Sequence, residues 1–372
     1  MAVCAAGFAF SANYTNHAPM VSALQGEFGF NQASAGLLTT GIFLTHALMQ
    51  IPGGRLADRI GAARMMGLAL AWVAAGNFAI AFSGAYWQLL FWKVFVGFGT
   101  GMAVTAGSRY VVSIFSGKSL HVAQGMFGGS IVLGSGFVIF AVPQLLGAFG
   151  WRGAFLGSAA VAAAVWLYWM AAAPRPEHNA KHAGSVMEMV RHGELWVLGV
   201  MQMASFGLVI VVGSWITALL KTNFQMPVRT AGVLGSTVLL LGILTRPLGG
   251  WLIQRTTMAR LVGLSLALNA LACVVLAGGQ SIGLTMAAVV ALGFGCGLPY
   301  SAVFTRAAKL YPDRAGASMG FVNMVGIVMI LVGAPVVGQL VDWSGAFRTS
   351  FLALAAFSAL AAAASATLKE KI

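Results

Sequence analysis

The chain has 372 residues, of which 59% are hydrophobic and only 8% are charged, whereas a soluble domain carries about 25% charged residues. This composition excludes a water-soluble fold of this size, because only lipid can cover so much apolar surface. The net charge of +13 requires no nucleic-acid partner, because the basic residues are distributed as in a membrane protein, as described below. The three cysteines lie in apolar runs, and their spacing predicts neither a metal site nor a disulfide framework.

The apolar runs predict twelve membrane-spanning helices, since one span needs about 20 apolar residues. We expect them at about residues 2–24, 34–52, 64–84, 88–112, 123–146, 152–172, 195–219, 231–252, 260–278, 282–306, 315–341 and 347–367. A polar stretch at residues 173–194 follows the sixth span. It divides the chain into an N-terminal six-helix half at 1–172, a cytoplasmic linker at 173–194 and a C-terminal six-helix half at 195–372. The predicted fold class is an all-α integral membrane protein with two pseudo-symmetric halves.

A duplication relates the two halves at a constant offset of 196 residues. The segment Gly53–Arg59 recurs as Gly249–Arg255. The same offset relates three further sets, namely Gly97–Gly101 and Gly293–Gly297, Ala35-Gly36 and Ala231-Gly232, and Arg152 with Phe155 and Arg348 with Phe351. Repeated halves in an apolar chain are typical of secondary transporters, whose substrate site lies between the repeats.

The basic residues predict the orientation of the chain in the membrane. With the N-terminus inside, fifteen of the 21 Lys and Arg residues fall in cytoplasmic loops and ends, and four fall in outer loops. Short cytoplasmic loops carry an excess of Lys and Arg. We therefore expect a multi-pass protein of the cytoplasmic (inner) membrane with both termini in the cytoplasm.

Two cations, Lys93 and Arg246, fall within the expected fourth and eighth spans, whereas all eight acidic residues fall in loops, the linker or the ends. A buried charge is costly unless it is paired, so the expected partner is an anion that binds and leaves. Arg246 suits this role best, because the planar guanidinium matches oxyanions in bidentate fashion. The alternative for Arg246 is snorkelling toward the cytoplasmic face. The alternative for Lys93 is a structural bond to free backbone carbonyls.

Other polar side chains within the spans are candidates for lining a cavity, although hydroxyls and amides also bond to neighbouring helices. The substrate-binding candidates beside the two cations are Asn13, Tyr14, Gln50, Trp215 and Tyr300. Asn13 and Tyr14 belong to a dense polar cluster with Thr15. His17 and His46 titrate near neutral pH, and they are the candidates for proton coupling.

The loop Gly54-Arg55-Leu56-Ala57-Asp58-Arg59-Ile60-Gly61 resembles the signature of the major facilitator superfamily, and the resemblance extends over the whole chain. In that family the acid and the arginine of this loop clamp helix ends across the two halves. The resemblance therefore implies gating by Gly54, Asp58, Arg59, Gly61, Arg64 and Arg109. The chain departs from the pattern at Ala62-Ala63, where a basic pair is usual, and at Gln254, where the second copy lacks the acid.

Two stretches resemble nitrate/nitrite porters and related small-anion carriers within this family, Gln124–Gly129 and Arg246–Gly250. Those porters hold the anion between one arginine on span two and one on span eight. Arg246 matches the second of these, and Gln50 stands in place of the first. The resemblance thus implies a singly charged anion such as nitrate, nitrite, cyanate or a monocarboxylate.

We expect a monomeric secondary active transporter that moves a small anion by alternating access, with no cofactor, no metal and no enzymatic activity. Exchange for another anion, proton coupling and uniport all stay open as driving forces, and so do the substrate and the direction of transport. One alternative is proton-coupled efflux of amphipathic drugs or metabolites, which the 18 Met and 24 Phe residues favour. The expected fifth span lacks the Gly-Pro pair typical of such exporters. Another alternative is a non-transporting receptor or an assembly factor with a carrier fold.

Overall fold

The computed structural model describes residues 1–14, 16–176, 185–279 and 281–368. Thr15, much of the expected linker and the last four residues lie outside the described residues. Close contacts divide the chain into two compact units. Unit 1 comprises Met1–Ser116, Ser130–Gly184 and Ala308–Gly320, and unit 2 comprises Gly117–Gly129, Ser185–Ala307 and Phe321–Ile372. Each unit therefore contains a short segment from the other half of the sequence. The two six-helix halves stay our proposal for the domain organisation.

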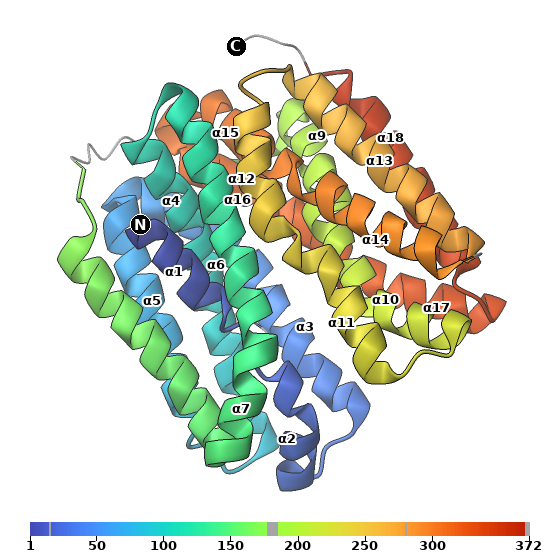
Figure 1. The fold of residues 1–372 in the computed structure, drawn as a ribbon. Helices are drawn as coiled ribbons and strands as arrows, with labels where there is room; N and C mark the ends of the chain where they lie inside the picture. Colours follow the sequence, from blue (N-terminus) through green and yellow to red (C-terminus); the bar gives the residue numbers. More distant parts are fainter. Residues whose placement is uncertain (15, 177–184, 280, 369–372) are drawn as a thin grey trace. The chain divides into compact units, whose positions relative to one another are not determined.

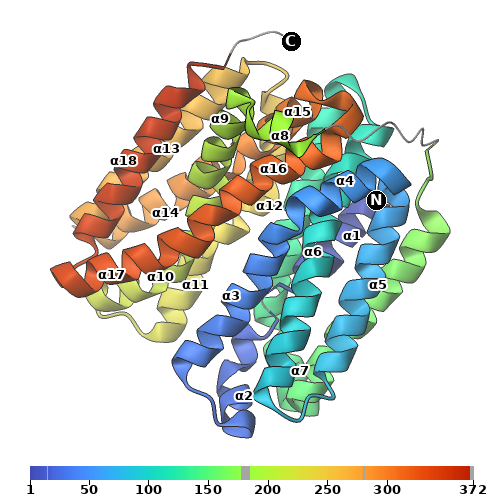
Figure 2. The ribbon, with the colours of Figure 1, turned by 180° about the vertical axis from the view of Figure 1, so that it is seen from behind.

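Unit 1 is built around one long helix, α6, which packs against α1, α3, α4 and α5. Figures 1 and 2 show α6 between α3 and α5. The elements of the N-terminal half are α1 Ala2–Ser11, η1 Ala18–Met20, α2 Val21–Phe28, α3 Gln32–Leu48, α4 Gln50–Ile60, α5 Ala62–Ile80, α6 Tyr86–Ile114 and α7 Gly117–Ala172.

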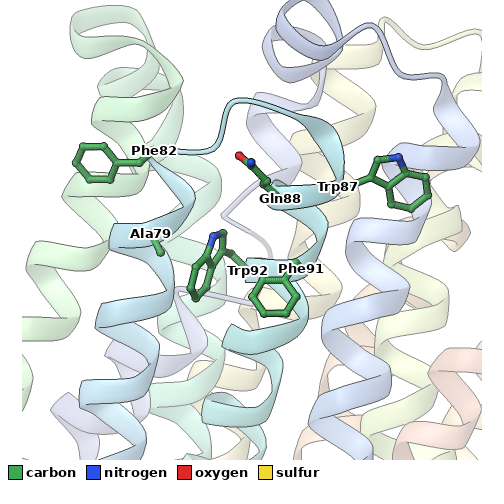
Figure 3. Close-up of a pocket in the computed structure, with 6 residues that line it drawn as sticks. All are labelled: Ala79, Phe82, Trp87, Gln88, Phe91 and Trp92. Atoms are coloured by element: carbon green, nitrogen blue, oxygen red, sulfur yellow. The ribbon is translucent and has the colours of Figure 1, made fainter.

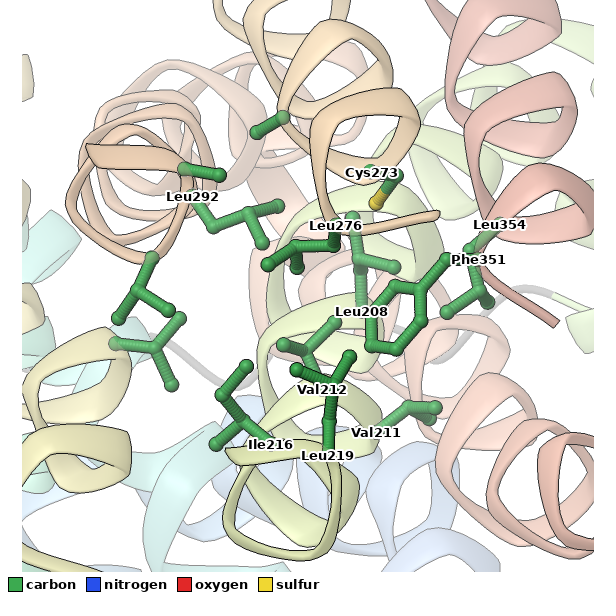
Figure 4. Close-up of a cluster of buried hydrophobic side chains, with 14 of the residues drawn as sticks. Leu208, Val211, Val212, Ile216, Leu219, Cys273, Leu276, Leu292, Phe351 and Leu354 are labelled. Atoms are coloured by element: carbon green, nitrogen blue, oxygen red, sulfur yellow. The ribbon is translucent and has the colours of Figure 1, made fainter. Parts of the chain in front are cut away.

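Unit 2 is held together by an apolar core that α10, α13, α14 and α18 share. Figure 4 shows Leu208 and Val212 of α10 near Leu276 of α13 and Phe351 of α18. The elements of the C-terminal half are α8 Val186–Val190, α9 Gly193–Gln202, η2 Met203–Gly207, α10 Leu208–Phe224, α11 Val228–Leu240, α12 Gly242–Leu252, α13 Met258–Gly278, α14 Ile282–Gly297, α15 Pro299–Leu310, η3 Pro312–Arg314, α16 Ala315–Val328, η4 Met329–Gly333, α17 Ala334–Ser344 and α18 Arg348–Ser365.

Within the described part of the chain, nine helices are long and apolar enough to cross a membrane. A tenth is counted when the pair formed by α3 and α4, bent by 45°, is one span. The 56-residue helix α7 covers both the fifth and the sixth expected spans, and Gly150 interrupts it with a φ of 68°. One bilayer crossing needs only about 20 residues, so α7 is long enough for two. The all-α fold is confirmed, and the number twelve stays a prediction.

The first expected span is not continuous. Helix α1 ends at Ser11, and the chain turns before η1 begins at Ala18. Asn13 turns its side chain back to the carbonyl of Ala9, 2.7 Å away, and Pro19 has no N–H to donate to a helix. Asn side chains that bond to nearby backbone compete with helix formation, which explains a break that hydropathy alone did not predict.

Candidate functional site

Arg246 lies on α12 in unit 2 and is 4% exposed. Its Nη1 donates a hydrogen bond to the carbonyl oxygen of Gly128 at 2.8 Å. The guanidinium carbon lies 4.6 Å from the ring centroid of Tyr300 and 5.8 Å from that of Phe206. A snorkelling side chain keeps its charged head in water, whereas this head is enclosed by two aromatic rings and a carbonyl group. These contacts favour the anion-binding interpretation over snorkelling.

Glycines at the start of α7 allow this close approach to Arg246. Residues 117–129 of α7 belong to unit 2. A Cβ on Gly125 would overlap the carbonyl oxygen of Arg246, and a Cβ on Gly128 would overlap the ring of Tyr300. Small residues let membrane helices pack at short distances. The glycine-rich sequence here thus shapes the enclosure of the arginine.

Tyr300 and Trp215 were both predicted to bind substrate, and the structure places them differently. Tyr300 is buried on α15 over the Arg246 guanidinium, and its ring stacks on Phe304 at 4.7 Å. Trp215 donates its indole N–H to the carbonyl of Ala334 at 3.0 Å. Its ring also packs near Phe347. The contacts described for Trp215 therefore bring it to α17 and Phe347, and only Tyr300 joins the arginine.

Lys93 is fully buried in unit 1 and contacts a network of three asparagines. Its Nζ donates to Oδ1 of Asn16 at 2.8 Å and to the carbonyl of Asn13 at 3.3 Å. Asn16 in turn donates from Nδ2 to Oδ1 of Asn77 at 2.9 Å. Asn16 and Asn77 were not predicted as site residues. Asn16 directly follows the polar cluster that selected Asn13, so extending that cluster by one residue would have found it, whereas Asn77 has no such signal.

Of four further candidates in unit 1, three lie close together. The ring of Tyr14 meets the ring of His46 edge-on at 5.1 Å, and Nδ1 of His46 lies 3.0 Å from Oγ1 of Thr100. Gln50 donates to the carbonyl of His46 at 3.1 Å. His17 lies apart, with Nε2 2.9 Å from Oγ1 of Thr39. The structure therefore joins Tyr14, His46 and Gln50 into one buried group.

The carboxylate of Asp58 caps the start of α16 within unit 1. Its oxygens accept hydrogen bonds from the backbone N–H groups of Gly316 and Ala317, each at 3.0 Å. Nε of Arg109 lies 2.9 Å from Oδ1 of the same carboxylate. A helix N-terminus favours negative charge, and a Cβ on Gly54 would overlap the carbonyl oxygen of Gly316. Asp58, Arg109 and Gly54 thus form one clamp on α16.

The other expected gating residues lie around this clamp. Arg59 and Arg64 have exposed side chains. Gly61 ends α4 with a φ of 93°, a backbone conformation that favours glycine, and α5 begins directly after it.

The second copy of this motif has different contacts. Gln254, at the position equivalent to Asp58, donates to the carbonyl oxygens of Lys118 and Gly250 at 3.2 and 3.1 Å. Arg306 forms an ion pair with Glu194 at 2.6 Å. Sequence reasoning placed Glu194 and Arg306 only as cytoplasmic charges. The carboxylate of Asp58, which caps α16, therefore corresponds to the neutral amide of Gln254 in the second copy.

A hollow of about 600 Å³ lies at the turn between α5 and α6. Figure 3 shows its aromatic lining, to which Phe82, Trp87, Phe91 and Trp92 contribute. Exposed tryptophans near the end of a span are typical of the membrane–water interface. The lining suits lipid contact better than it suits an anion.

The comparisons with known proteins agree with the geometry. Residues 3–218 and 195–371 match the family model described as Major Facilitator Superfamily. The "Probable nitrate/nitrite antiporter NarK1" of Thermus thermophilus is 23% identical over 369 residues, covering 90% of this chain and 83% of that protein. The "Nitrite extrusion protein" of Bacillus subtilis is 21% identical over 337 residues, covering 90% and 85%.

Solved structures share the fold. The crystal structure of the major facilitator transporter FucP in the outward conformation has a TM-score of 0.82 at 16% identity, covering 100% of this chain and 98% of that chain. The family match extends over nearly the whole sequence, and the described helices include at least nine that can cross a membrane. The chain therefore belongs to the major facilitator superfamily and is a multi-pass membrane transporter, not an enzyme.

Proposed function

We propose that this protein is a secondary active transporter of a small monovalent anion, of the nitrate, nitrite, cyanate or monocarboxylate type. The observation that carries the proposal is Arg246, a cation that is 4% exposed and lies between two aromatic rings. The names of the relatives from Thermus thermophilus and Bacillus subtilis support a nitrogen oxyanion. We further propose that it acts as a monomer in the cytoplasmic membrane with both termini inside.

The charge of the proposed site favours a monovalent substrate. The position equivalent to Arg246 in the first repeat is Gln50, which is neutral and fully buried. One guanidinium balances one negative charge, whereas a divalent anion would keep an uncompensated charge in a low-dielectric site. We propose that Gln50, Tyr14, Asn13, Trp215 and Lys93 contact the anion along its path. The bonds of Lys93 to Asn16 and Asn13 also support a structural role for that lysine.

We propose that the Asp58 clamp opens and closes during alternating access. Movement of α4 away from the start of α16 breaks two N–H bonds to Asp58 and separates Gly54 from Gly316. The ion pair with Arg109 holds the carboxylate in place. Arg59, Gly61 and Arg64 support the same clamp from the turn between α4 and α5.

Substitution of Arg246 tests the proposed function. Purified protein in liposomes is assayed for uptake of nitrate, nitrite, cyanate and small carboxylates. We expect Arg246→Ala to reduce uptake of the preferred anion to the level of empty liposomes, because truncation of a buried ionic partner removes about 3–5 kcal/mol of binding. Arg246→Lys keeps the charge without the planar fork, and we expect it to retain partial transport.

Arg348→Ala is the matched control, because Arg348 is exposed at the start of α18. It should transport like the wild type. Equal anion uptake by Arg246→Ala and the wild type would show that the site lies elsewhere. A wild type that carries none of these anions would refute the anion-transport proposal as a whole.

A further inference from the structure

We infer that Gln124 is a second side chain that binds the transported anion, beside Arg246, and that it selects for oxyanions with two or more accessible oxygens. The inference rests on the proposed function. Gln124 is fully buried on α7, and neither its Nε2 nor its Oε1 has a hydrogen-bond partner among the described residues. Buried side-chain amides nearly always have partners. A buried glutamine whose Nε2 and Oε1 both have no hydrogen-bond partner among the described residues therefore indicates a ligand.

The geometry of α7 places Gln124 next to the enclosure of Arg246. Gln124 precedes Gly128 by four residues, about one helical turn, so both lie on the same face of the helix. The carbonyl of Gly128 accepts the hydrogen bond from Arg246, and a Cβ at Gly128 would overlap the ring of Tyr300. A Cβ on the adjacent Gly125 would overlap the Arg246 carbonyl oxygen. The face that carries Gln124 therefore packs against α12 and α15 where Arg246 and Tyr300 meet.

The chemistry of an amide complements that of the guanidinium. Nε2 of a glutamine offers two N–H donors without adding charge, and a guanidinium offers five. Together they can donate to several oxygens of one planar anion while the charge of the site stays at one. A halide has no separate oxygens for these directed donors. The pair therefore favours nitrate, nitrite or a carboxylate over chloride.

The test uses Gln124→Met and Gln124→Glu in the full-length protein in liposomes. Met has a similar size and no N–H donors, so we expect the KM for the oxyanion to rise about tenfold or more, with a smaller change in maximal rate. We also expect the preference for oxyanion over chloride to fall. Glu keeps the shape but adds a negative charge to the helix face that packs near Arg246, and we expect it to abolish uptake.

Gln144→Met is the matched control, because Gln144 is an exposed glutamine on the same helix. It should keep the KM and the selectivity of the wild type. Thermal melting in detergent reports whether each variant is folded, and isothermal titration with nitrate separates binding from transport. Gln124→Asn, which keeps a shorter amide, should lie between wild type and Met if the Met variant is too unstable to assay.

The outcomes separate this inference from the proposed function. Wild-type KM and selectivity in Gln124→Met, together with loss of uptake in Arg246→Ala, would refute the role of Gln124 and leave the anion transporter standing. A fall in maximal rate with unchanged KM and unchanged nitrate affinity in the Gln124 variants would also refute it, because that pattern indicates a structural role. Absence of anion uptake by the wild type would refute both proposals.

Discussion

Arg246 and Lys93 are the two fully or nearly fully buried basic residues of the described chain, and their surroundings differ in kind. Lys93 donates to an amide oxygen and a backbone carbonyl within a network of asparagines. Arg246 contacts two aromatic rings and one backbone carbonyl of α7, whose glycines allow the helix to pack closely. The amide network suits a cation that holds the break after α1 in place. The aromatic enclosure suits a cation that binds a planar anion.

The role of the asparagine network can be tested by its contribution to stability. We expect Asn16→Leu to destabilise the protein by about 2 kcal/mol, because a buried ammonium loses an acceptor oxygen. The measurement is a lower melting temperature in detergent. The double variant Lys93→Met with Asn16→Leu should recover part of the loss, because both polar partners are then gone.

Asn223→Leu, at an exposed position near the end of α10, is the matched control and should melt with the wild type. A normal melting temperature for Asn16→Leu would contradict the structural role of this contact with Lys93.

At the scale of elements, the start of α16 is held by the end of α4, where Asp58 lies 258 residues earlier in the sequence than Gly316. Asp58 satisfies N–H groups that the helix itself leaves open, and Gly54 removes the side chain that would keep the two segments apart. In the second copy Gln254 bonds to carbonyl oxygens instead. A Cβ on Gly250, the counterpart of Gly54, would likewise overlap a carbonyl oxygen, that of His121. The two copies therefore share the close glycine contact, whereas only the first has the charged contact of Asp58.

A methyl group at Gly54 tests the clamp. We expect Gly54→Ala to push α4 from α16, because its Cβ would overlap the Gly316 carbonyl oxygen. Overpacking costs about 1–3 kcal/mol, which shifts a conformational equilibrium by a factor of roughly 5 to 150. Anion uptake should fall by a similar factor while the protein stays folded. The measurement is the initial uptake rate in liposomes.

Gly36→Ala on α3 is the control, since nothing lies within 4 Å of a Cβ built there. It should transport like the wild type. Unchanged uptake by Gly54→Ala would show that the contact with Gly316 does not limit the transport cycle.

At the scale of the whole molecule, the distribution of titratable residues over the chain bears on how transport is driven. The sequence places no carboxylate in an expected span, which directs attention to the histidines for proton coupling. His46 belongs to the same buried group as Gln50 and Tyr14, whereas His17 contacts Thr39. We therefore propose His46 as the first coupling candidate and His17 as the second.

A pH gradient across the liposome membrane tests this coupling. We expect an inward proton gradient to accelerate anion uptake several-fold in the wild type, because protons that enter with the anion supply the driving force. In His46→Gln the acceleration should be lost, while exchange of labelled for unlabelled anion continues. The measurement is the initial rate at equal external pH with and without the gradient. An uptake rate that is indifferent to the gradient would remove both histidines from the coupling proposal.

Hydropathy, charge distribution and the 196-residue repeat were enough to predict an all-α membrane transporter with two halves, because membrane insertion depends on the local apolar content of each segment. The superfamily came from the resemblance of the loop at residues 54–61 to a known signature. The same patterns selected Arg246, since a charge in an apolar run stands out locally, whereas the resemblance selected Asp58. Asn16 and Asn77 were missed, and so was the break after Ser11, because short amides look like ordinary packing residues until their partner is known.

The tertiary structure alone decided which groups meet. Hydrogen bonds join Arg246 to the Gly128 carbonyl over 118 residues of sequence, Lys93 to Asn16 over 77 residues, and Asp58 to Gly316 at the start of α16 over 258 residues. Such contacts depend on how helices pack, and the helices pack closely where glycines have no side chain. The sequence by itself thus determined that lipid surrounds the protein, which fold it adopts and which two charges lie in the spans. Long-range packing determined that one of these cations contacts asparagines and the other contacts aromatic rings.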